Sequence, residues 1–443
     1  MSKLLVWSLG TGARPDDRKK GSYRSANYFV DAHEPLKTTN IYQALTSFYD
    51  FDRYVVIGTS GSGWNDLYFS LCSENTDFDE DYWQALNSWF DQKEHYRDNV
   101  KDFRQLLSKL KSHLGERCAE IIVLKYGLNN HEMLENFEIL SDISAYINNG
   151  DSLSFDITHS FRSLAFYELL AVSYFKDVVK KDVEIDFVSY GMLEISNELN
   201  GKTPIINMKP LIDILEWIKA AEEYKSFGTA YKLSALLERD NLGYSLGKVE
   251  SKALKRLGDI ISGNDIIEFK NLVKNCNNTV KAVENKRRSE HLVVGWIFRD
   301  ISERFGDKLD DDFLLRFELA KWHYENKRGF VSAITLSETL LDFFADCANL
   351  KRDLESDDAK LRQCIWKAYS TNSIVNQQIV YYNDIARTLR NSICHGKPLD
   401  TESGKKLETV LEYFKTAYEK DFKNNQSNQN DLSHALNNKI DDM

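Results

Sequence analysis

The sequence predicts an α/β domain with a mostly parallel sheet, followed by an all-α half. Two observations lead to this prediction. Up to Met208, short apolar runs alternate with segments of helical periodicity, which is the pattern of a parallel α/β fold. From Lys209 onward the strand-like runs stop, and apolar residues recur at three- and four-residue steps. The predicted segments are an α/β domain at 1–208, a helical linker region at 209–305, a second helical domain at 306–422 and a disordered tail at 423–443.

The composition is that of a globular protein with room for two or three domains. Its 443 residues are 42% hydrophobic, and the mean hydropathy is −0.47. A net charge of −11 does not suit a protein that coats long nucleic acid, although it allows a small basic cleft. The six cysteines form no CxxC pair, which predicts reduced thiols in the cytoplasm and no zinc site. No apolar run is long enough for a membrane span, and the N-terminal run is too short for a signal peptide.

Short apolar runs in the first half predict the buried strands of the sheet. These runs are Leu4 to Leu9, Tyr54 to Ile57, Glu120 to Leu124, Leu153 to Ile157 and Val183 to Tyr190. Helices are expected between them, at Thr38 to Tyr49, Phe103 to Leu114, His131 to Asn148 and Ser163 to Phe175. Ser22 to Val30 is expected as a hairpin arm, and Met192 to Ser196 with Ile205 to Met208 as an edge hairpin.

Two of the predicted strands end in glycine-rich loops. The loops read Gly10-Thr11-Gly12 and Gly58-Thr59-Ser60-Gly61-Ser62-Gly63. Parallel sheets bind ligands at the carboxyl ends of their strands, where backbone N–H groups can hold phosphates. Neither loop is a Walker loop or a dinucleotide fingerprint, and each loop taken alone is more often a simple turn.

A third strand end brings an acid, hydroxyls, an imidazole and a guanidinium to one strand-to-helix junction. It reads Asp156-Ile157-Thr158-His159-Ser160-Phe161-Arg162. The alternative is that Asp156 or Ser160 caps the helix and that Arg162 is solvated. This stretch and the Leu-Gly-Thr-Gly after the first strand resemble the CARF domain (CRISPR-associated Rossmann fold), over Met1 to Met208. The family often has Gly where this chain has Ser160.

The resemblance implies that these loops meet across a dimer two-fold axis and bind a cyclic oligoadenylate. The tetra-adenylate is favoured as the activator, and the hexa-adenylate remains open. The implied contact residues are Gly10, Thr11, Gly12, Thr59, Ser60, Gly61, Asp156, Thr158, His159, Ser160 and Arg162.

The second half is predicted to consist of helices. They are expected at Leu211 to Phe227, Ala230 to Glu238, Val249 to Ile261, Ile266 to Arg288, His291 to Phe305, Phe313 to Glu325, Phe330 to Cys347 and Glu402 to Phe422. A further helix is expected before Gly396, with Arg390, Asn391 and His395 near its end. Asn391 and His395 share a face, because they are one turn apart.

These residue types suit phosphodiester chemistry, because an arginine holds a phosphate and a histidine moves protons. Helices also end in Arg, His and Gly for capping reasons alone. Arg390, Asn391 and His395 match, residue by residue, the signature of HEPN ribonucleases. The segment Phe330 to Cys347, with Glu338 in it, resembles the helix that packs beside the motif helix in those enzymes.

Together the two resemblances imply a CARF–HEPN ribonuclease of type III CRISPR systems. The implied activity is metal-independent cleavage of single-stranded RNA to a 2′,3′-cyclic phosphate, with no cofactor. No cluster of carboxylates, His or Cys has metal-ligand spacing. A homodimer or higher oligomer is expected, since one Arg and one His make a thin site. The alternatives are a ligand-responsive RNA- or protein-binding module, and a toxin-like HEPN ribonuclease that oligoadenylate does not control.

Overall fold

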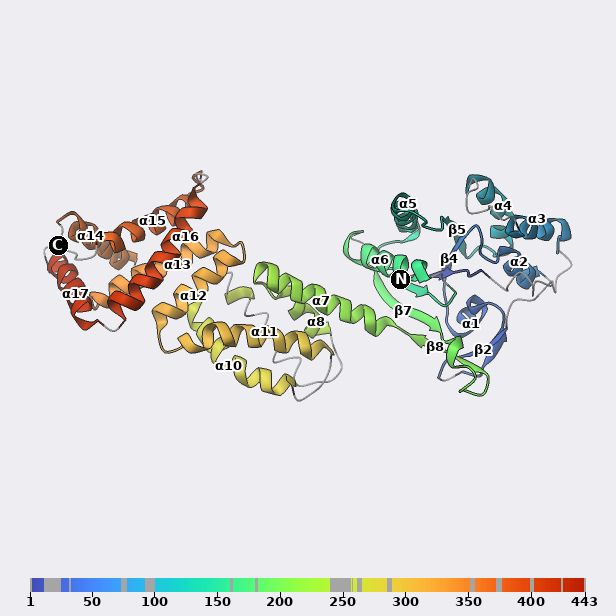
Figure 1. Ribbon diagram of the computed structural model, residues 1–443, viewed down its shortest axis with the longest axis horizontal. Helices are drawn as coiled ribbons and strands as arrows, with labels where there is room; N and C mark the ends of the chain where they lie inside the picture. Colours follow the sequence, from blue (N-terminus) through green and yellow to red (C-terminus); the bar gives the residue numbers. More distant parts are fainter. Residues whose placement is uncertain are drawn as a thin grey trace. The chain divides into compact units, whose positions relative to one another are not determined.

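The chain divides into two compact units, Met1–Asp213 and Ile214–Met443. The elements of each are labelled in Figure 1. The computed structural model describes residues 2–11, 25–31, 33–72, 78–91, 100–159, 162–179, 182–239, 256, 258–260, 265–284, 289–350, 355–371, 377–398, 402–423 and 425–441. The boundary falls inside helix α7 (Lys209–Phe227), close to the predicted change of fold at Lys209.

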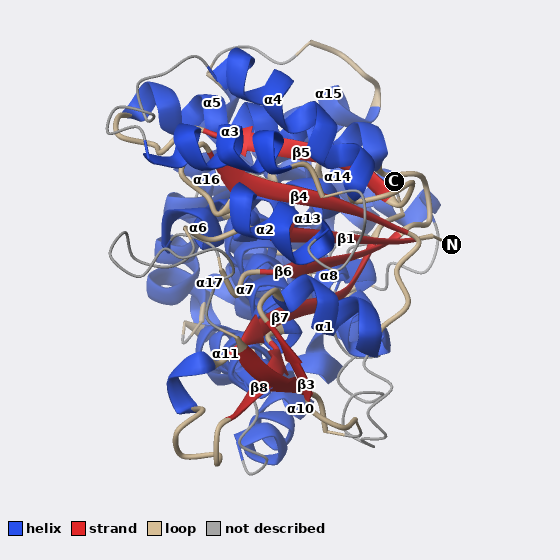
Figure 2. Cartoon of the chain, turned by 90° about the vertical axis from the view of Figure 1, so that its right-hand side faces the viewer, coloured by secondary structure: helices blue, strands red, loops and turns tan. Residues whose placement is uncertain are grey.

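The first unit is built on a sheet with the strand order β3-β2-β8-β7-β6-β1-β4-β5. Its strands are β1 (Lys3–Ser8), β2 (Ala26–Phe29), β3 (Leu36–Thr38), β4 (Arg53–Thr59), β5 (Cys118–Leu124), β6 (Ser152–Asp156), β7 (Glu184–Gly191) and β8 (Lys202–Asn207). The five strands from β7 to β5 in this order run parallel to one another. β8 is antiparallel to β7, and β3 is antiparallel to β2. Figure 2 shows the strands in red.

Helices cover both faces of this sheet because alternate residues of its strands point to opposite sides. Leu5 and Trp7 of β1 lie in one core, with α1 (Ile41–Phe48), α2 (Trp64–Cys72), α3 (Glu80–Asp91) and α4 (Val100–His113). Leu4 and Val6 lie in the other core, with α5 (Asn130–Ser141) and α6 (Arg162–Asp177). The predicted α/β domain with a mostly parallel sheet is confirmed.

The prediction of an edge hairpin after β7 is wrong in two respects. Leu193–Ile195 form a single 3-10 turn, so Met192 to Ser196 is not a strand. β8 does pair with β7, but it lies inside the sheet, because the β2–β3 hairpin continues the sheet beyond it. The predicted hairpin arm at Ser22 to Val30 is β2 within the residues that the structure describes.

The second unit is helical. Its helices are the remainder of α7, α8 (Tyr231–Arg239), α10 (Ile266–Glu284), α11 (Ser289–Phe305), α12 (Asp312–Glu325), α13 (Gly329–Cys347), α14 (Glu355–Ser370), α15 (Gln377–Cys394), α16 (Ser403–Ala417) and α17 (Gln426–Asp441). Most of the predicted helix at Val249 to Ile261 lies outside the described residues. The region predicted as a linker forms a core together with α12, in which Phe269 and Phe298 are buried with Trp322.

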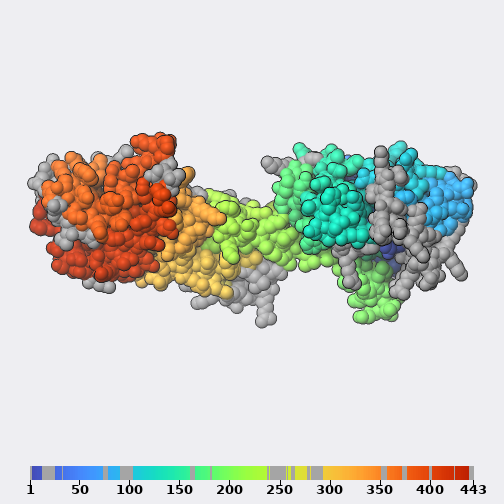
Figure 3. Space-filling view, turned by 45° about the horizontal axis from the view of Figure 1, so that its top comes forward, coloured from blue at the N-terminus to red at the C-terminus, as the bar shows by residue number. Residues whose placement is uncertain are grey.

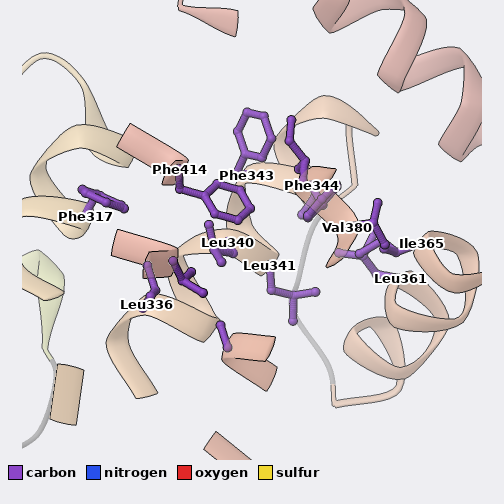
Figure 4. Packing of buried hydrophobic residues seen from close by; sticks show 14 of the residues in the cluster. Phe317, Leu336, Leu340, Leu341, Phe343, Phe344, Leu361, Ile365, Val380 and Phe414 are labelled. Atoms are coloured by element: carbon purple, nitrogen blue, oxygen red, sulfur yellow. The ribbon is translucent and has the colours of Figure 1, made fainter. Parts of the chain in front are cut away.

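The C-terminal helices pack around α13. Leu336, Leu340 and Phe344 of this helix are fully buried among side chains from α12, α14, α15, α16 and α17 (Figure 4). The predicted disordered tail is wrong for Gln426–Asp441, which forms α17. Leu432 and Leu436 of α17 are one turn apart and buried, so a narrow apolar stripe holds an otherwise polar helix against α13 and α14.

Candidate functional site

The loops that follow β1, β4 and β6 touch one another at the carboxyl edge of the sheet. β1 lies between β4 and β6, and the chain reaches β6 only after β5 on the far side, so the strand order reverses at β1. A Cβ on Gly10 would lie 2.7 Å from the carbonyl oxygen of His159, so only glycine fits there. The amide of Gly63 donates to the carbonyl of Gly10 at 2.7 Å. The three predicted loops therefore form one site.

Some polar groups of the loop after β4 form hydrogen bonds that fix the conformation of this loop. The Ser62 hydroxyl donates to the carbonyl of Leu9 at 2.7 Å and accepts from the amide of Thr59 at 2.9 Å. Thr59 and Ser60 are buried. Burial raises the pKa of Tyr126, whose hydroxyl forms hydrogen bonds with both residues. The Thr59 amide is thus used within the loop, and its predicted contact with a phosphate stays a prediction.

Asp156 is fully buried and fixes the loop after β6. Its Oδ1 accepts from the hydroxyls of Thr158 and Ser189, each at 2.7 Å. The Thr158 hydroxyl oxygen in turn accepts from the amide of Gly191 at 2.7 Å. Burial raises the pKa of Asp156 to about 6, although the hydrogen bonds favour its charged form. Asp156 is therefore a supporting residue that fixes the position of Thr158.

His159 lies beside Gly10 with one ring nitrogen near Tyr28. The Tyr28 hydroxyl is 3.4 Å from Nε2 of His159. Packing around the ring lowers the pKa of His159 to about 4, so the ring is neutral at pH 7. A neutral imidazole can exchange hydrogen bonds with a base or ribose but adds no positive charge for a phosphate.

A second buried carboxyl lies behind these loops. Glu168 of α6 is 2% exposed and accepts a hydrogen bond from the hydroxyl of Ser8, at the end of β1. Burial, together with the nearby Asp156, raises the pKa of Glu168 well above its ordinary value. In the sequence, Glu168 is an acidic residue within the apolar run of α6, and it is not among the candidate residues predicted from the sequence. Tyr28, Tyr126 and Ser189 were missed too, because only the fold brings them to the loops.

Some predicted contact residues lie outside the description. Gly12 and Ser160 are not among the described residues, nor is the side chain of Arg162, whose backbone begins α6. Thr11 is described and exposed.

In the second unit, His395 directly follows the last residue of α15. Gly396 has a φ of +61°, a left-handed conformation that glycine adopts without strain. The turn is closed by amides that donate to carbonyls of the last helical turns: His395 to Asn391 at 3.0 Å, Gly396 to Ile393 at 3.1 Å and Lys397 to Ser392 at 2.8 Å. This pattern confirms the predicted glycine stop, and it leaves the His395 side chain exposed.

Arg390 is oriented by two neighbours. Its Nη1 donates to Oδ1 of Asn391 at 3.1 Å, and its Nε lies 3.8 Å from Oε1 of Glu338 on α13. The same Glu338 oxygen lies 3.6 Å from Nη2 of Arg362 on α14. The predicted packing of the Glu338 helix beside the motif helix is present. Arg362 was missed, because we did not predict α14.

Arg390 and His395 of one chain are not on the same side of α15. Five residues correspond to about 140° around a helix axis. Asn391 lies between them, one turn before His395 and bonded to Arg390. The structure thus brings Arg390 and Asn391 together, with His395 at the end of the same helix.

The described residues show neither a metal-ligand cluster nor a membrane span. They contain no group of three or more His, Cys, Asp or Glu side chains that could hold a metal ion. Among the described helices, none has the length and apolar character of a membrane span.

The chain matches known CRISPR-associated proteins. Residues 4–193 match the family model of the CARF domain of the CRISPR system endoribonuclease Csx1, and residues 213–311 that of the second domain of CRISPR-associated protein MJ1674. CRISPR-associated protein MJ1674 of Methanocaldococcus jannaschii is 26% identical over 466 residues, which cover 97% of this chain and 70% of that protein. Enterococcus italicus Csm6 bound to cyclic hexa-2′-fluoro-hexa-dAMP aligns over 100% of both chains, with 12% identity and a TM-score of 0.41.

The family matches agree with the architecture. The first covers the sheet unit, and the second covers most of the region that has its own core between α7 and α12. The first unit is therefore a CARF domain, and a helical C-terminal half follows it.

Proposed function

We propose that this protein is an endoribonuclease of type III CRISPR antiviral defence that a cyclic oligoadenylate switches on. It cleaves single-stranded RNA in the cytoplasm without a metal ion. The observation that carries the proposal is the presence, in one chain, of a CARF domain and of Arg390, Asn391 and His395 at the exposed C-terminal end of helix α15. The first supplies a sensor and the second supplies the groups that phosphodiester cleavage needs.

The proposed chemistry gives each of these side chains one role. Arg390, which Asn391 and Glu338 orient, holds the scissile phosphate and neutralises charge as the phosphorus becomes five-coordinate. The ribose 2′-oxygen forms a bond to phosphorus as the bond to the 5′-oxygen breaks. His395 takes the proton of the 2′-hydroxyl or gives one to the leaving 5′-oxygen. The products are a 2′,3′-cyclic phosphate and a 5′-hydroxyl.

The ligand is a ring of phosphates and adenines, and the loop cluster offers groups for both. Thr11 lies exposed beside Gly10, and Arg162 begins α6 next to the loop after β6. His159 and Thr158 provide neutral hydrogen-bonding groups for ribose or adenine edges. We favour the tetra-adenylate, because a four-membered ring suits a two-fold axis; the hexa-adenylate suits it as well, and a test includes both.

Dimerisation is supported by an apolar face on the first unit. Met133 and Leu134 of α5, and Phe166, Leu169 and Leu170 of α6, are all exposed, although the two helices pack side by side. The region of α5, drawn in teal, lies at the surface in Figure 3. A contiguous apolar face of this kind marks an interface, and a second copy of the chain would cover it with the same face.

The proposal is tested by incubating the purified full-length protein with a fluorophore- and quencher-labelled single-stranded RNA in EDTA. Cleavage is expected when cyclic tetra- or hexa-adenylate is added and not with linear oligoadenylate. RNA that binds but stays intact with every ring size would instead support a ligand-responsive binding module. Cleavage at the same rate with and without ligand would support a toxin-like enzyme.

A further inference from the structure

A second arginine lies beside the nuclease site. Arg362 of α14 and Arg390 of α15 approach the same oxygen of Glu338, at 3.6 Å and 3.8 Å. One carboxylate oxygen of Glu338 thus lies between the two guanidinium groups. The side chains of both arginines are partly exposed, at 25% and 34%. An anion held by Arg390 would therefore have a second cationic group within reach.

Trp366 is one helical turn after Arg362 on the same side of α14. It is 58% exposed, and its ring centroid lies 5.8 Å from that of Tyr369. Leu361 and Ile365 of α14 are buried in the core (Figure 4), so the helix that presents the indole is held firmly.

We propose that Arg362 and Trp366 form a binding subsite for the nucleotide next to the scissile phosphate. This inference rests on the proposed ribonuclease function and extends its substrate contacts. Arg362 binds the phosphate of that nucleotide, and Trp366 stacks on its base. A basic group beside an exposed aromatic ring is the combination by which proteins hold single-stranded nucleic acid.

The subsite gives a physical reason for a preference for single strands. An indole can stack only on a base that is free of its neighbours, and the bases of an RNA duplex are already stacked and paired. Every base has a flat face, so the subsite recognises the unpaired state rather than one sequence. A second copy of this chain is the other candidate to cover the exposed indole. That contact does not account for the arginine one turn away.

The test measures binding separately from cleavage. In the full-length His395→Ala background, fluorescence anisotropy follows a labelled single-stranded RNA and a duplex of the same sequence, with activating ligand present. Trp366→Ala is expected to weaken binding of the single strand about tenfold, to leave duplex binding unchanged, and to be partly rescued by Trp366→Phe. Arg362→Gln is expected to weaken binding of both RNAs and to lower their salt dependence. Phe330→Ala removes another exposed aromatic side chain of this unit and serves as the control. It should leave the affinities for the single strand and for the duplex unchanged.

The kinetic readout uses the parent background. Trp366→Ala should raise KM with little change in kcat, because the stacking contact is made equally before and during the reaction. Single-strand binding of Trp366→Ala at the parental affinity would overturn the proposal. Light scattering that shows a changed oligomeric state for Trp366→Ala would overturn it as well and assign the indole to a contact between copies. If His395→Ala still cleaves RNA while Trp366→Ala binds weakly, the catalytic assignment fails and the subsite stands.

Discussion

The two histidines of the candidate sites lie in different environments. His395 is exposed at a helix end and free to meet a substrate, whereas His159 is packed against Gly10 and Tyr28 and kept neutral. Carboxyls differ in the same way. Glu338 is partly exposed between two arginines, whereas Asp156 is buried and accepts hydrogen bonds from the hydroxyls of Thr158 and Ser189. Each environment suits one task, proton transfer and phosphate binding in one unit and loop support in the other.

Replacing His395 by Ala should abolish RNA cleavage while leaving the fold intact. The imidazole ring is the proposed proton-transfer group, and such a group contributes about a hundredfold or more to the rate. Because the ring lies in an exposed turn, its removal should change the free energy of unfolding by less than about 0.5 kcal/mol. Ligand-induced cleavage rates and thermal melts of the variant check both expectations. Cys394→Ser, a change to the exposed neighbour, is the matched control and keeps parental activity. A His395→Ala protein that cleaves at the parental rate removes His395 from the site.

Replacing Asp156 by Asn should change the pH dependence of stability. The pKa of Asp156 is raised from 3.8 to about 6 in the folded protein, so between these values the folded state holds a proton that the unfolded state has lost. The stabilisation of the folded protein by the protonated Asp156 carboxyl is complete below about pH 4 and is lost as the pH rises to 6. Asn does not titrate, so the free energy of unfolding of the parent minus that of the variant should fall by about 3 kcal/mol across this window. Denaturant unfolding at pH 4, 5, 6 and 7 measures it, and a constant difference would contradict the pKa assignment.

At the scale of elements, the strands and most helices could be predicted because each has one strong local pattern. β1 and β4 are continuous apolar runs, and α13 buries a broad apolar stripe. The many Asn and Gln residues of α17 predict disorder, because its apolar residues are few. The sequence of α14 is rich in charged residues, so its helical pattern is weak. Helix α17 is held by its contacts with α13 and α14, which no local pattern reveals.

The docking of α17 can be tested by removing its anchor. Leu436 is fully buried, so Leu436→Ala should lower the free energy of unfolding by about 2–5 kcal/mol. Ser427→Ala, at an exposed position of the same helix, should leave it unchanged. Denaturant melts of the full-length proteins give both values. Equal stability of the two variants would mean that the segment is not packed in solution, as the composition had indicated.

How well each candidate site can be predicted depends on how close its residues are in the sequence. Arg390, Asn391 and His395 are close in sequence, so one helix end places them together. Glycine-rich and polar strand ends could be assigned to one edge of a parallel sheet before the structure was known. Tyr28, Glu168 and Arg362 reach the sites from distant segments, and only the strand order or helix packing determines their positions.

At the scale of the whole molecule, the proposed ligand loops and the proposed nuclease residues belong to separate units of one chain. A ligand that binds one unit can change activity in the other only by favouring one of the conformations that the protein already samples. Two copies related by a two-fold axis would bring two sets of ligand loops together and pool two copies of Arg390 and His395.

The dimer can be tested at the apolar face of the first unit. Phe166→Glu places a charge where the proposed interface excludes water, and it should raise the dissociation constant of the dimer at least about 30-fold. Ile267→Glu, at an exposed apolar position of α10, is the control and should leave the dimer intact. Size-exclusion chromatography with light scattering across a dilution series measures both. A Phe166→Glu protein that stays dimeric at every concentration would place the interface elsewhere.

The most direct test of the central claim is the dose response of RNA cleavage to cyclic tetra- and hexa-adenylate in EDTA, for the parent, Arg162→Ala and Arg390→Ala. The parent should be silent without ligand and active with at least one ring. Arg162→Ala should need more ligand and approach the parental maximum, because the loss is in binding. Arg390→Ala should stay inactive at every dose, since ligand cannot replace a catalytic group. Cleavage by the parent that is independent of both rings, or that requires added magnesium or manganese, would contradict the account.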